Sequence, residues 1–185
     1  TPMTGVMGMA ELLLSTPLNP LQHDYTQAMQ RSGTMLLKLL NDALDLARIE
    51  AGRLELEPVA FEPRQLLEEV AQLEQGLAHA RGLRFVLDAA ADLPPQLLGD
   101  ALRIKQVLLN LANNALKFTE RGQVTLRGQR TADGLKFSVS DTGPGIPEAS
   151  QARLFQRFEQ EEGPQRSAGS GLGLAICREL VDMMG

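Results

Sequence analysis

Apolar residues at the start of the chain recur every three or four positions, which is the spacing of one helical face. They are Met3, Val6, Met7, Ala10, Leu13 and Leu14. The following segment, STPLNP at 15–20, combines two prolines with residues that commonly cap helices. We therefore predict a short first helix over about 3–14 and the start of a second helix soon after it.

The second helix is predicted over about 21–50, where a long apolar stripe continues with the same spacing. The stripe consists of Tyr25, Met29, Ser32, Leu36, Leu39, Ala43 and Leu46, and is widened by Leu37, Leu40, Leu44 and Ala47. A helix of ~30 residues is about 45 Å long, and a face this broad must pack against more than one neighbour. Two such hairpins closing into a four-helix bundle would cover it, so we expect a homodimer through residues 1–50. The alternative is a helix buried against its own domain.

Beyond Gly52 the pattern changes to short alternating segments separated by helical ones. Residues 54–61 show a strand-like pattern, and a helix opened by Pro63 and ended by Gly82 follows. We then predict a strand at 84–88 and a helix at 101–118. Two strands at 123–130 and 135–141, joined by a turn at Asp133-Gly134, precede a last helix at 171–184. This order indicates an α/β sandwich with one sheet and helices on one face. The fold class is thus α+β, with a helical hairpin at 1–52 and a second domain at 53–185. The polar, glycine-rich segment 159–170 is expected to form a lid.

Composition and charge exclude several classes of protein. With 43% hydrophobic and 22% charged residues, the 185-residue chain can bury a core like ordinary globular domains. The net charge of -5 argues against nucleic acid as a partner. A single cysteine, Cys177, allows no internal disulfide, so we expect a reducing, cytoplasmic location. No run of eighteen apolar residues exists, so no membrane contact is expected here; because the chain begins at Thr1, we expect a fragment whose anchor, if any, lies outside it.

Three polar residues of the helix predicted at 101–118 share one face. Asn110, Asn114 and Lys117 follow one another at steps of four and three. An amide oxygen can ligate Mg²⁺ and a lysine can neutralise phosphate, so the spacing suits a metal-bound nucleotide. The polar face of an ordinary surface helix would have the same pattern.

A second motif, Asp141-Thr-Gly-Pro-Gly-Ile146, stands at the end of a predicted strand. A carboxylate there can accept a hydrogen bond from an exocyclic amine, and Gly143 and Gly145 permit close approach of a ligand to the backbone. Aspartate, glycine and proline are also the usual residues of turns. The motif by itself therefore indicates either a ligand pocket or a turn.

A third motif, Gly169-Ser-Gly171-Leu-Gly173, precedes the last predicted helix. Glycines at a helix N-terminus expose backbone N–H groups where the helix dipole favours anions. No Lys-Ser/Thr pair follows, which excludes a Walker A loop, and no strand of a βαβ unit precedes it, which excludes a dinucleotide fingerprint. A flexible linker is the alternative.

Taken in order, these motifs resemble the N, G1, F and G2 boxes of sensor histidine kinases, with Phe155 and Phe158 of LFQRFEQ in the F box. The segment LNDALDLARIEAGRLELE resembles the second dimerisation helix of that family, especially of its hybrid members. Thr1-Pro2 resembles the tail of the H box, His-Glu-x-x-Thr-Pro. The resemblance covers essentially the whole chain, and four motifs in sequence order make it highly specific.

The resemblance implies an ATP-dependent protein-histidine kinase that uses ATP and Mg²⁺. On α-helical positions of the first motif, Asn114 would ligate Mg²⁺ with Asn110 beside it, Lys117 would contact phosphates and Phe118 would pack near the adenine. Asp141 would bind the adenine amine, and the base pocket would be lined by Gly143, Gly145 and Ile146. The phosphates would be surrounded by Gly169, Gly171, Leu172 and Gly173, with Arg166 as a lid cation. Ala168 stands where the family often has glycine, so the register of Arg166 is open.

The resemblance also places functional groups outside the chain. The phosphoacceptor histidine would lie three residues before Thr1, and further strands would follow Gly185; His23 and His79 are expected at the surface. Thr1 matches the threonine that orients water when such kinases dephosphorylate their response regulators, or it simply caps the helix opened by Pro2. The implied partners are a second copy of the chain and a response regulator or receiver domain, and the implied location is cytoplasmic, including the cytoplasmic part of a membrane-anchored sensor.

Two other functions fit parts of the pattern. An ATP hydrolase of the gyrase, Hsp90 and MutL group shares this nucleotide fold, but Asn110 occupies the place of the glutamate that activates water in the gyrase and MutL members, and an amide cannot act as a base. A non-catalytic dimerisation or scaffold module would not need the intact set of Asn114, Lys117 and Asp141. An ATP-binding titration separates it from the kinase.

Overall fold

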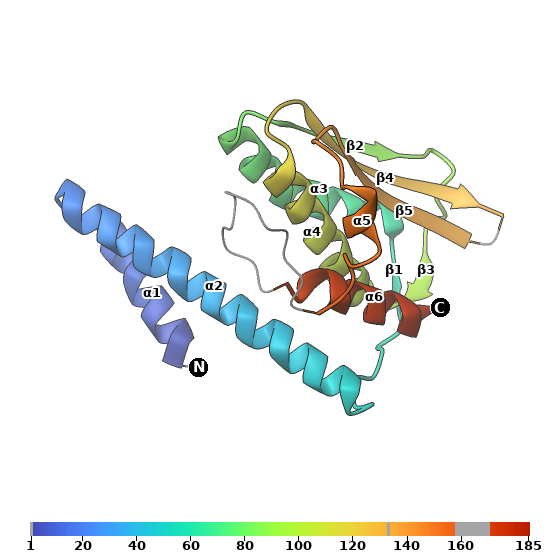
Figure 1. The fold of residues 1–185 in the computed structure, drawn as a ribbon, viewed down its shortest axis with the longest axis horizontal. Coiled ribbons are helices and arrows are strands. Elements are labelled where there is room, and N and C mark those ends of the chain that lie inside the picture. Colours follow the sequence, from blue (N-terminus) through green and yellow to red (C-terminus); the bar gives the residue numbers. More distant parts are fainter. Residues whose placement is uncertain (1, 133, 158–170) are drawn as a thin grey trace.

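The computed structural model describes residues 2–132, 134–157 and 171–185, and it begins with a helical hairpin (Figure 1). Helix α1 spans Pro2–Leu14 and α2 spans Pro20–Glu50, within one residue of the predicted limits. A capping box fixes the start of α2, because the side chains of Asn19 and Gln22 each accept the other's backbone N–H, at 2.9 and 3.1 Å. Gly33 of α2 lies so close to Met7 of α1 that a larger residue there would displace the Met7 side chain.

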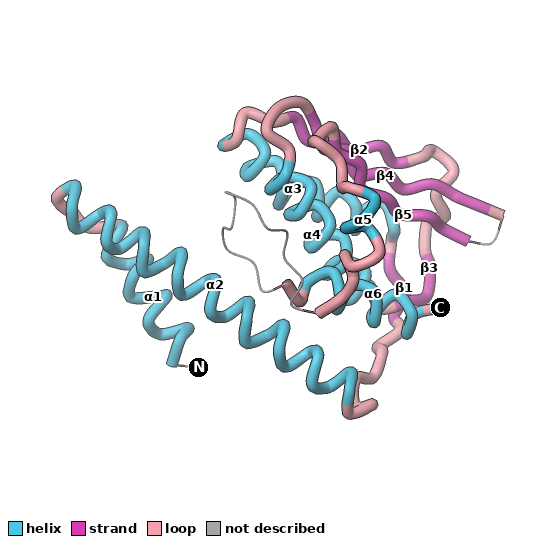
Figure 2. The backbone as a smooth tube through the Cα atoms, viewed as in Figure 1, coloured by secondary structure: helices cyan, strands magenta, loops and turns pink. Residues whose placement is uncertain are grey.

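The rest of the chain alternates strands and helices, as the sequence predicts. Its elements are β1 (Val59–Phe61), α3 (Pro63–Ala80), β2 (Arg84–Ala89), β3 (Leu97–Gly99), α4 (Ala101–Phe118), β4 (Gln123–Thr131), β5 (Gly134–Asp141), α5 (Glu148–Gln151) and α6 (Gly173–Met184). Figure 2 shows the strands gathered away from the hairpin, with α4 and α6 between them and α2. No helix within the described ranges is both long and apolar enough to cross a membrane.

The strands form two sheets in the described residues, so the expectation of a single sheet is wrong. In the larger sheet, β4 pairs in parallel with β2 and antiparallel with β5. The smaller sheet pairs β1 with β3, with Ala60 opposite Leu98. These two short strands lead directly into α3 and α4, and they pair with each other at the start of these helices instead of extending the larger sheet. The alternating pattern at 54–56 forms no strand.

Helices α3 and α4 cover one face of the three-stranded sheet with two connected apolar clusters. One cluster contains Leu67, Val70, Leu108 and Leu126, and the other contains Ala78, Leu83, Ala115, Leu116 and Val124. Leu67, Leu116 and Leu126 are completely buried, and each such side chain stabilises the fold by about 2 kcal/mol. The sandwich part of the prediction, with helices on one face of a sheet, is therefore confirmed.

The C-terminal half of α2 packs against the second domain. A third apolar cluster joins Leu46 of α2 and Leu54 to Val107, Leu172, Ile176, Cys177 and Leu180. The Asp45 carboxylate accepts hydrogen bonds from Arg103 at 3.1 Å and Gln106 at 2.8 Å, both on α4. Glu50 at the end of α2 forms an ion pair with Arg157. The end of the stripe at Leu46 is thus buried against its own chain, which is the alternative considered for the whole helix, whereas Leu36, Leu40 and Leu44 in the same half remain exposed.

Candidate nucleotide-binding site

Helix α4 carries the first predicted motif and is fixed at its start by Asp100. This buried carboxylate caps α4 by accepting the Arg103 N–H at 3.0 Å, and it also accepts the Glu57 N–H at 3.0 Å from the segment after the hairpin. The Asp100 cap therefore fixes the start of the helix that carries the polar face.

The three polar residues of that face differ in their surroundings. Asn110 is 9% exposed, which an ordinary polar surface face would not explain, whereas Asn114 and Lys117 are half-buried. The Asn114 amide forms no hydrogen bond with the described residues, so its oxygen is available to a ligand. The Lys117 ammonium lies 5.0 Å from the centre of the Phe118 ring, a cation–π distance, and it forms no hydrogen bond with the described residues.

Asp141 ends β5 next to the C-terminal end of α4. Its Oδ1 atom accepts the N–H of Gly143 at 2.8 Å, the hydrogen bond of an Asx turn. A Cβ atom added to Gly143 would lie 2.8 Å from that oxygen and 3.2 Å from the carbonyl oxygen of Phe118. The motif therefore forms a turn, and the turn brings Asp141, Gly143 and Phe118 together. The second oxygen of the exposed Asp141 carboxylate accepts no hydrogen bond from the described residues.

The next residues of this loop are open to solvent. Gly145 has a φ of +75°, a left-handed conformation that favours glycine, and no atom lies near the position of a Cβ there. Ile146 is 45% exposed and Phe118 is 39% exposed. Two apolar side chains thus remain uncovered beside Asp141, at the place where the sequence predicts an adenine.

The third motif meets the first at the start of α6. Gly171 has a φ of +66°, which a helix cannot contain, so α6 begins at Gly173 and not at Gly171 as expected. A Cβ atom added to Gly173 would lie 3.5 Å from Oδ1 of Asn110. Leu172 is buried in the cluster that joins α2, α4 and α6. The N-terminus of α6 therefore lies directly against the Asn110 side chain.

Several predicted residues lie outside the described part of the chain. They are Thr1, Phe158, Arg166, Ala168 and Gly169, together with the lid expected at 159–170. Phe155 is described and is 44% exposed. His23 and His79 are exposed, as expected.

The structure adds polar groups that the sequence did not single out. Lys38 of α2 donates a hydrogen bond from Nζ to Oδ1 of Asn110 at 3.2 Å. Glu74 of α3 is 4% exposed; its Oε1 accepts the Asn113 amide N–H at 2.9 Å, and its Oε2 has no hydrogen-bond partner among the described residues. Burial raises the pKa of Glu74, while the Asn113 hydrogen bond and the Lys38 charge act against this. No local pattern marks these contacts, which join residues far apart in the chain.

Cys177 lies on α6, close to Asn110 of α4. Burial raises the pKa of its thiol to about 11, against the effects of the hydrogen bond with Asn110 and the charge of Lys38. The thiol is therefore protonated and behaves as a small apolar group of the core.

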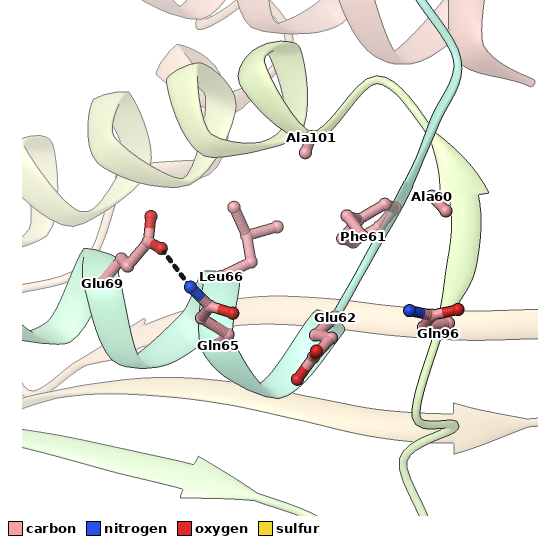
Figure 3. Close-up of a pocket in the computed structure, with 8 residues that line it drawn as sticks. All are labelled: Ala60, Phe61, Glu62, Gln65, Leu66, Glu69, Gln96 and Ala101. Carbon is pink, nitrogen blue, oxygen red and sulfur yellow. Dashed lines mark hydrogen bonds between the residues drawn. The ribbon is translucent and has the colours of Figure 1, made fainter.

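A surface cavity elsewhere in the domain is separate from these motifs. The cavity has a volume of about 240 Å³ and is bordered by β1, α3 and the first residue of α4, Ala101 (Figure 3). Ala101 and Asn114 are thirteen residues apart on one helix, or about 20 Å at 1.5 Å per residue. In the cavity wall, the hydrogen bond from Lys105 lowers the pKa of Glu69. The cavity is not part of the site formed by Asn110, Asn114 and Asp141.

Comparison with known proteins gives matches over both domains. Residues 1–52 match the His Kinase A (phospho-acceptor) domain, and residues 99–185 match the histidine kinase-, DNA gyrase B- and HSP90-like ATPase family. The chain is 41% identical over 192 residues to the signal transduction histidine-protein kinase BarA of Escherichia coli strain K12, with all of this chain and 21% of BarA covered. It thus spans about a fifth of the length of this relative.

Two solved structures extend the match. Full-length ShkA in complex with AMPPNP is 42% identical, with a TM-score of 0.80 over 100% of this chain and 38% of that one. A nucleotide-free catalytic domain of histidine kinase ThkA is 30% identical, with a TM-score of 0.59 over 69% of this chain and 82% of that one. The two family matches, the order of the motifs and these structures agree, and the chain belongs to the sensor histidine kinases.

Proposed function

We propose that this chain is the catalytic core of a two-component sensor histidine kinase. It would bind Mg-ATP in the second domain, 53–185, and transfer the γ-phosphate to a histidine of the hairpin domain, 1–52, for relay to a response-regulator aspartate. The observation that carries the proposal is the convergence of three separate motifs: the end of α4 touches the Asp141 turn, and the start of α6 touches Asn110.

The adenine would lie at the C-terminal end of α4. The second carboxylate oxygen of Asp141 can accept a hydrogen bond from the adenine amine, and the exposed side chains of Phe118 and Ile146 can cover the base. The glycines at 143 and 145 keep the loop backbone close to it. A carboxylate acceptor excludes guanine, which presents a carbonyl oxygen at the same position.

The phosphates would extend from there along α4 toward α6. Lys117 can neutralise phosphate charge, and α6, which begins at Gly173, points its N-terminus toward them in the favourable direction of the helix dipole. Gly169 and Arg166 are proposed to complete this part of the site. Positioning and charge neutralisation are the main contributions that a protein makes to phosphoryl transfer.

The donor set fits Mg²⁺ that arrives with the nucleotide. Asn114 offers one amide oxygen with no partner among the described residues, and no group of three His, Cys, Asp or Glu residues in the described ranges could hold a metal. Mg²⁺ usually keeps several waters and binds through few protein oxygens together with substrate phosphates. Asn114 is therefore the proposed ligand, and the ion would neutralise charge on the transferred phosphoryl group.

The hairpin is proposed to dimerise and to present the acceptor. Its exposed large apolar residues are Val6, Met9, Leu12, Leu13, Leu21, Tyr25, Met29, Met35, Leu36, Leu40 and Leu44. A stripe of this extent is unusual on a monomer surface and would be covered in a four-helix bundle. A response regulator or receiver domain is the proposed acceptor of the phosphoryl group, Thr1 is proposed to act in the reverse dephosphorylation, and the cytoplasm is the proposed location.

Nucleotide binding tests the proposal directly. Calorimetry should show binding of Mg-ATP and not of Mg-GTP, and Asp141→Asn should weaken ATP binding strongly because the amide presents a donor to the adenine amine. Binding of GTP as tightly as ATP, or an unaffected variant, would refute the site.

Phosphoryl transfer needs a second experiment. With radiolabelled ATP, the chain itself should remain unlabelled, whereas a version extended upstream through the H-box histidine should acquire acid-labile, base-stable label. Label of that type on the present chain would mean that His23 or His79 accepts phosphate and that the acceptor is misplaced. Asn110 offers no base for water, which is why transfer is preferred to hydrolysis.

A further inference from the structure

Lys38 joins the hairpin to the candidate nucleotide site. It lies on α2 seven residues before Asp45, and therefore two turns away on the same face. The contacts of Asp45 with Arg103 and Gln106 hold this face of α2 against α4. In that arrangement the Lys38 ammonium donates to Oδ1 of Asn110 at 3.2 Å, although the two residues are 72 positions apart in the sequence.

The oxygen that Lys38 contacts is also next to the start of α6. The Cβ position of Gly173, the first residue of that helix, is 3.5 Å from Oδ1 of Asn110. A helix N-terminus carries a partial positive charge and attracts anions. The ammonium adds a full positive charge beside it, on the side of Asn110 that faces the hairpin.

The ammonium also has unused hydrogen-bonding capacity. A lysine has three N–H donors, and the contact with Asn110 is the one hydrogen bond that Lys38 forms with the described residues. The Lys38 side chain is exposed, so a ligand can reach it. The positive charge of Lys38 also acts on two buried groups, because it opposes the effect of burial on the pKa of both Cys177 and Glu74.

The position of Lys38 along α4 decides which part of a nucleotide it would meet. Asp141 and Gly143 contact α4 at Phe118, whereas Lys38 contacts it at Asn110, eight residues or about 12 Å away. The adenine is assigned to the first of these positions, at Phe118. A cation at the second position, at Asn110, is placed for the phosphates and is too far away to touch the base.

We propose that Lys38 is a phosphate-binding residue of the nucleotide site, contributed by the hairpin helix when the two domains are docked. The inference rests on the proposed function, because it requires a nucleotide between Asp141 and Asn110. It adds a consequence that the second domain alone does not have: the affinity for the phosphates depends on the hairpin being in contact with α4.

The test compares ligands with and without phosphates on the whole chain. Dissociation constants for Mg-ATP and for adenosine are measured by calorimetry for the unmodified chain, Lys38→Met, Lys38→Arg and Arg31→Met. Arg31 is an exposed cation on the same helix and controls for the loss of one positive charge. We expect Lys38→Met to weaken Mg-ATP binding about tenfold, as for the loss of one charged hydrogen bond, with adenosine binding unchanged. Lys38→Arg should retain most of the affinity and Arg31→Met all of it.

Three outcomes would overturn the proposal while leaving the nucleotide site intact. The first is that Lys38→Met binds ATP as tightly as the unmodified chain. The second is that Lys38→Met binds ATP more tightly, which would make Lys38 a competitor for Asn110. The third is that Arg31→Met loses as much ATP affinity as Lys38→Met. Unchanged adenosine binding shows that a variant is folded. If the unmodified chain binds neither ATP nor adenosine, the proposed function itself fails, and the role of Lys38 fails with it.

Discussion

Replacing Gly143 with alanine tests whether the Asp141 turn and the end of α4 form one rigid ligand site. Gly143 has no left-handed φ, so alanine strains no backbone angle, and the effect is steric alone. The added Cβ would lie 2.8 Å from Oδ1 of Asp141 and 3.2 Å from the carbonyl oxygen of Phe118. Ordinary contacts are longer than either distance, so both neighbours must give way.

The two neighbours differ in how they can respond. The Asp141 carboxylate can rotate, but doing so breaks its 2.8 Å hydrogen bond with the Gly143 N–H. The carbonyl of Phe118 belongs to the last turn of α4 and can move only with the helix end. Overpacking of this kind costs about 1–3 kcal/mol, which for a chain of this size lowers Tm by about 2–4 °C per kcal/mol. Because the displaced carboxylate is the proposed adenine acceptor, ATP affinity should fall at least tenfold, or about 1.4 kcal/mol.

Calorimetric ATP titration and thermal unfolding of Gly143→Ala measure these two effects. Gly76→Ala is the matched control, because Gly76 lies inside α3 with no atom near its Cβ position. That variant should be more stable by about 0.5–1 kcal/mol and should bind ATP normally. Unchanged ATP affinity and Tm in Gly143→Ala would show that the loop adapts freely and would refute the rigid site.

Three further predictions concern the dimer face and the buried titratable groups. Leu40→Glu should give monomers in light scattering, because Leu40 is 48% exposed on the apolar stripe; Asn41→Glu, at an exposed neighbouring position, should not, and a monomeric unmodified chain at high concentration would count against the dimer. Glu74→Gln should raise the free energy of unfolding in urea at pH 7 by about 1 kcal/mol. Burial raises the pKa of the Glu74 carboxyl, so the folded protein loses stability as pH rises through that pKa. The gain in Glu74→Gln should therefore shrink at acidic pH, and an equal gain at acidic pH and at pH 7 would be evidence against this cause. The pKa of Cys177, raised by burial to about 11, should make stability fall between pH 9 and 11, and Cys177→Ala should lose that decrease in a pH series of unfolding midpoints.

The limits of most of the helices, though not the start of α6, could be predicted because their signals are local. The Asn19-Pro20 and Gln22 residues form the cap of α2 among themselves, and Pro63 and Ala101 begin their helices as expected. By contrast, β3 follows Pro94 and Pro95 and has only three residues, too few for any periodicity. It is a strand because β1, some forty residues earlier, supplies its hydrogen-bonding partner.

The residues of the proposed site could be named in advance, because each motif has a recognisable spacing. Their convergence could not be derived from spacing, since it depends on how α4, the Asp141 turn and α6 pack together. Spacing likewise could not predict that a side chain at Gly143 would be too close to its neighbours, or that Asn110 is buried.

Sequence alone determined which residues of α2 are apolar, but tertiary structure decided what each of them contacts. A single stripe is divided along the helix: Leu46 packs against Ile176 and Leu180 of its own chain, while Leu36 and Leu40 stay exposed. Within the exposed part, between Leu36 and Leu40, the polar Lys38 reaches Asn110 across 72 positions of sequence. Helical periodicity depends on neighbours within a few residues, whereas the partner of a face depends on where the rest of the chain folds, which local spacing does not encode.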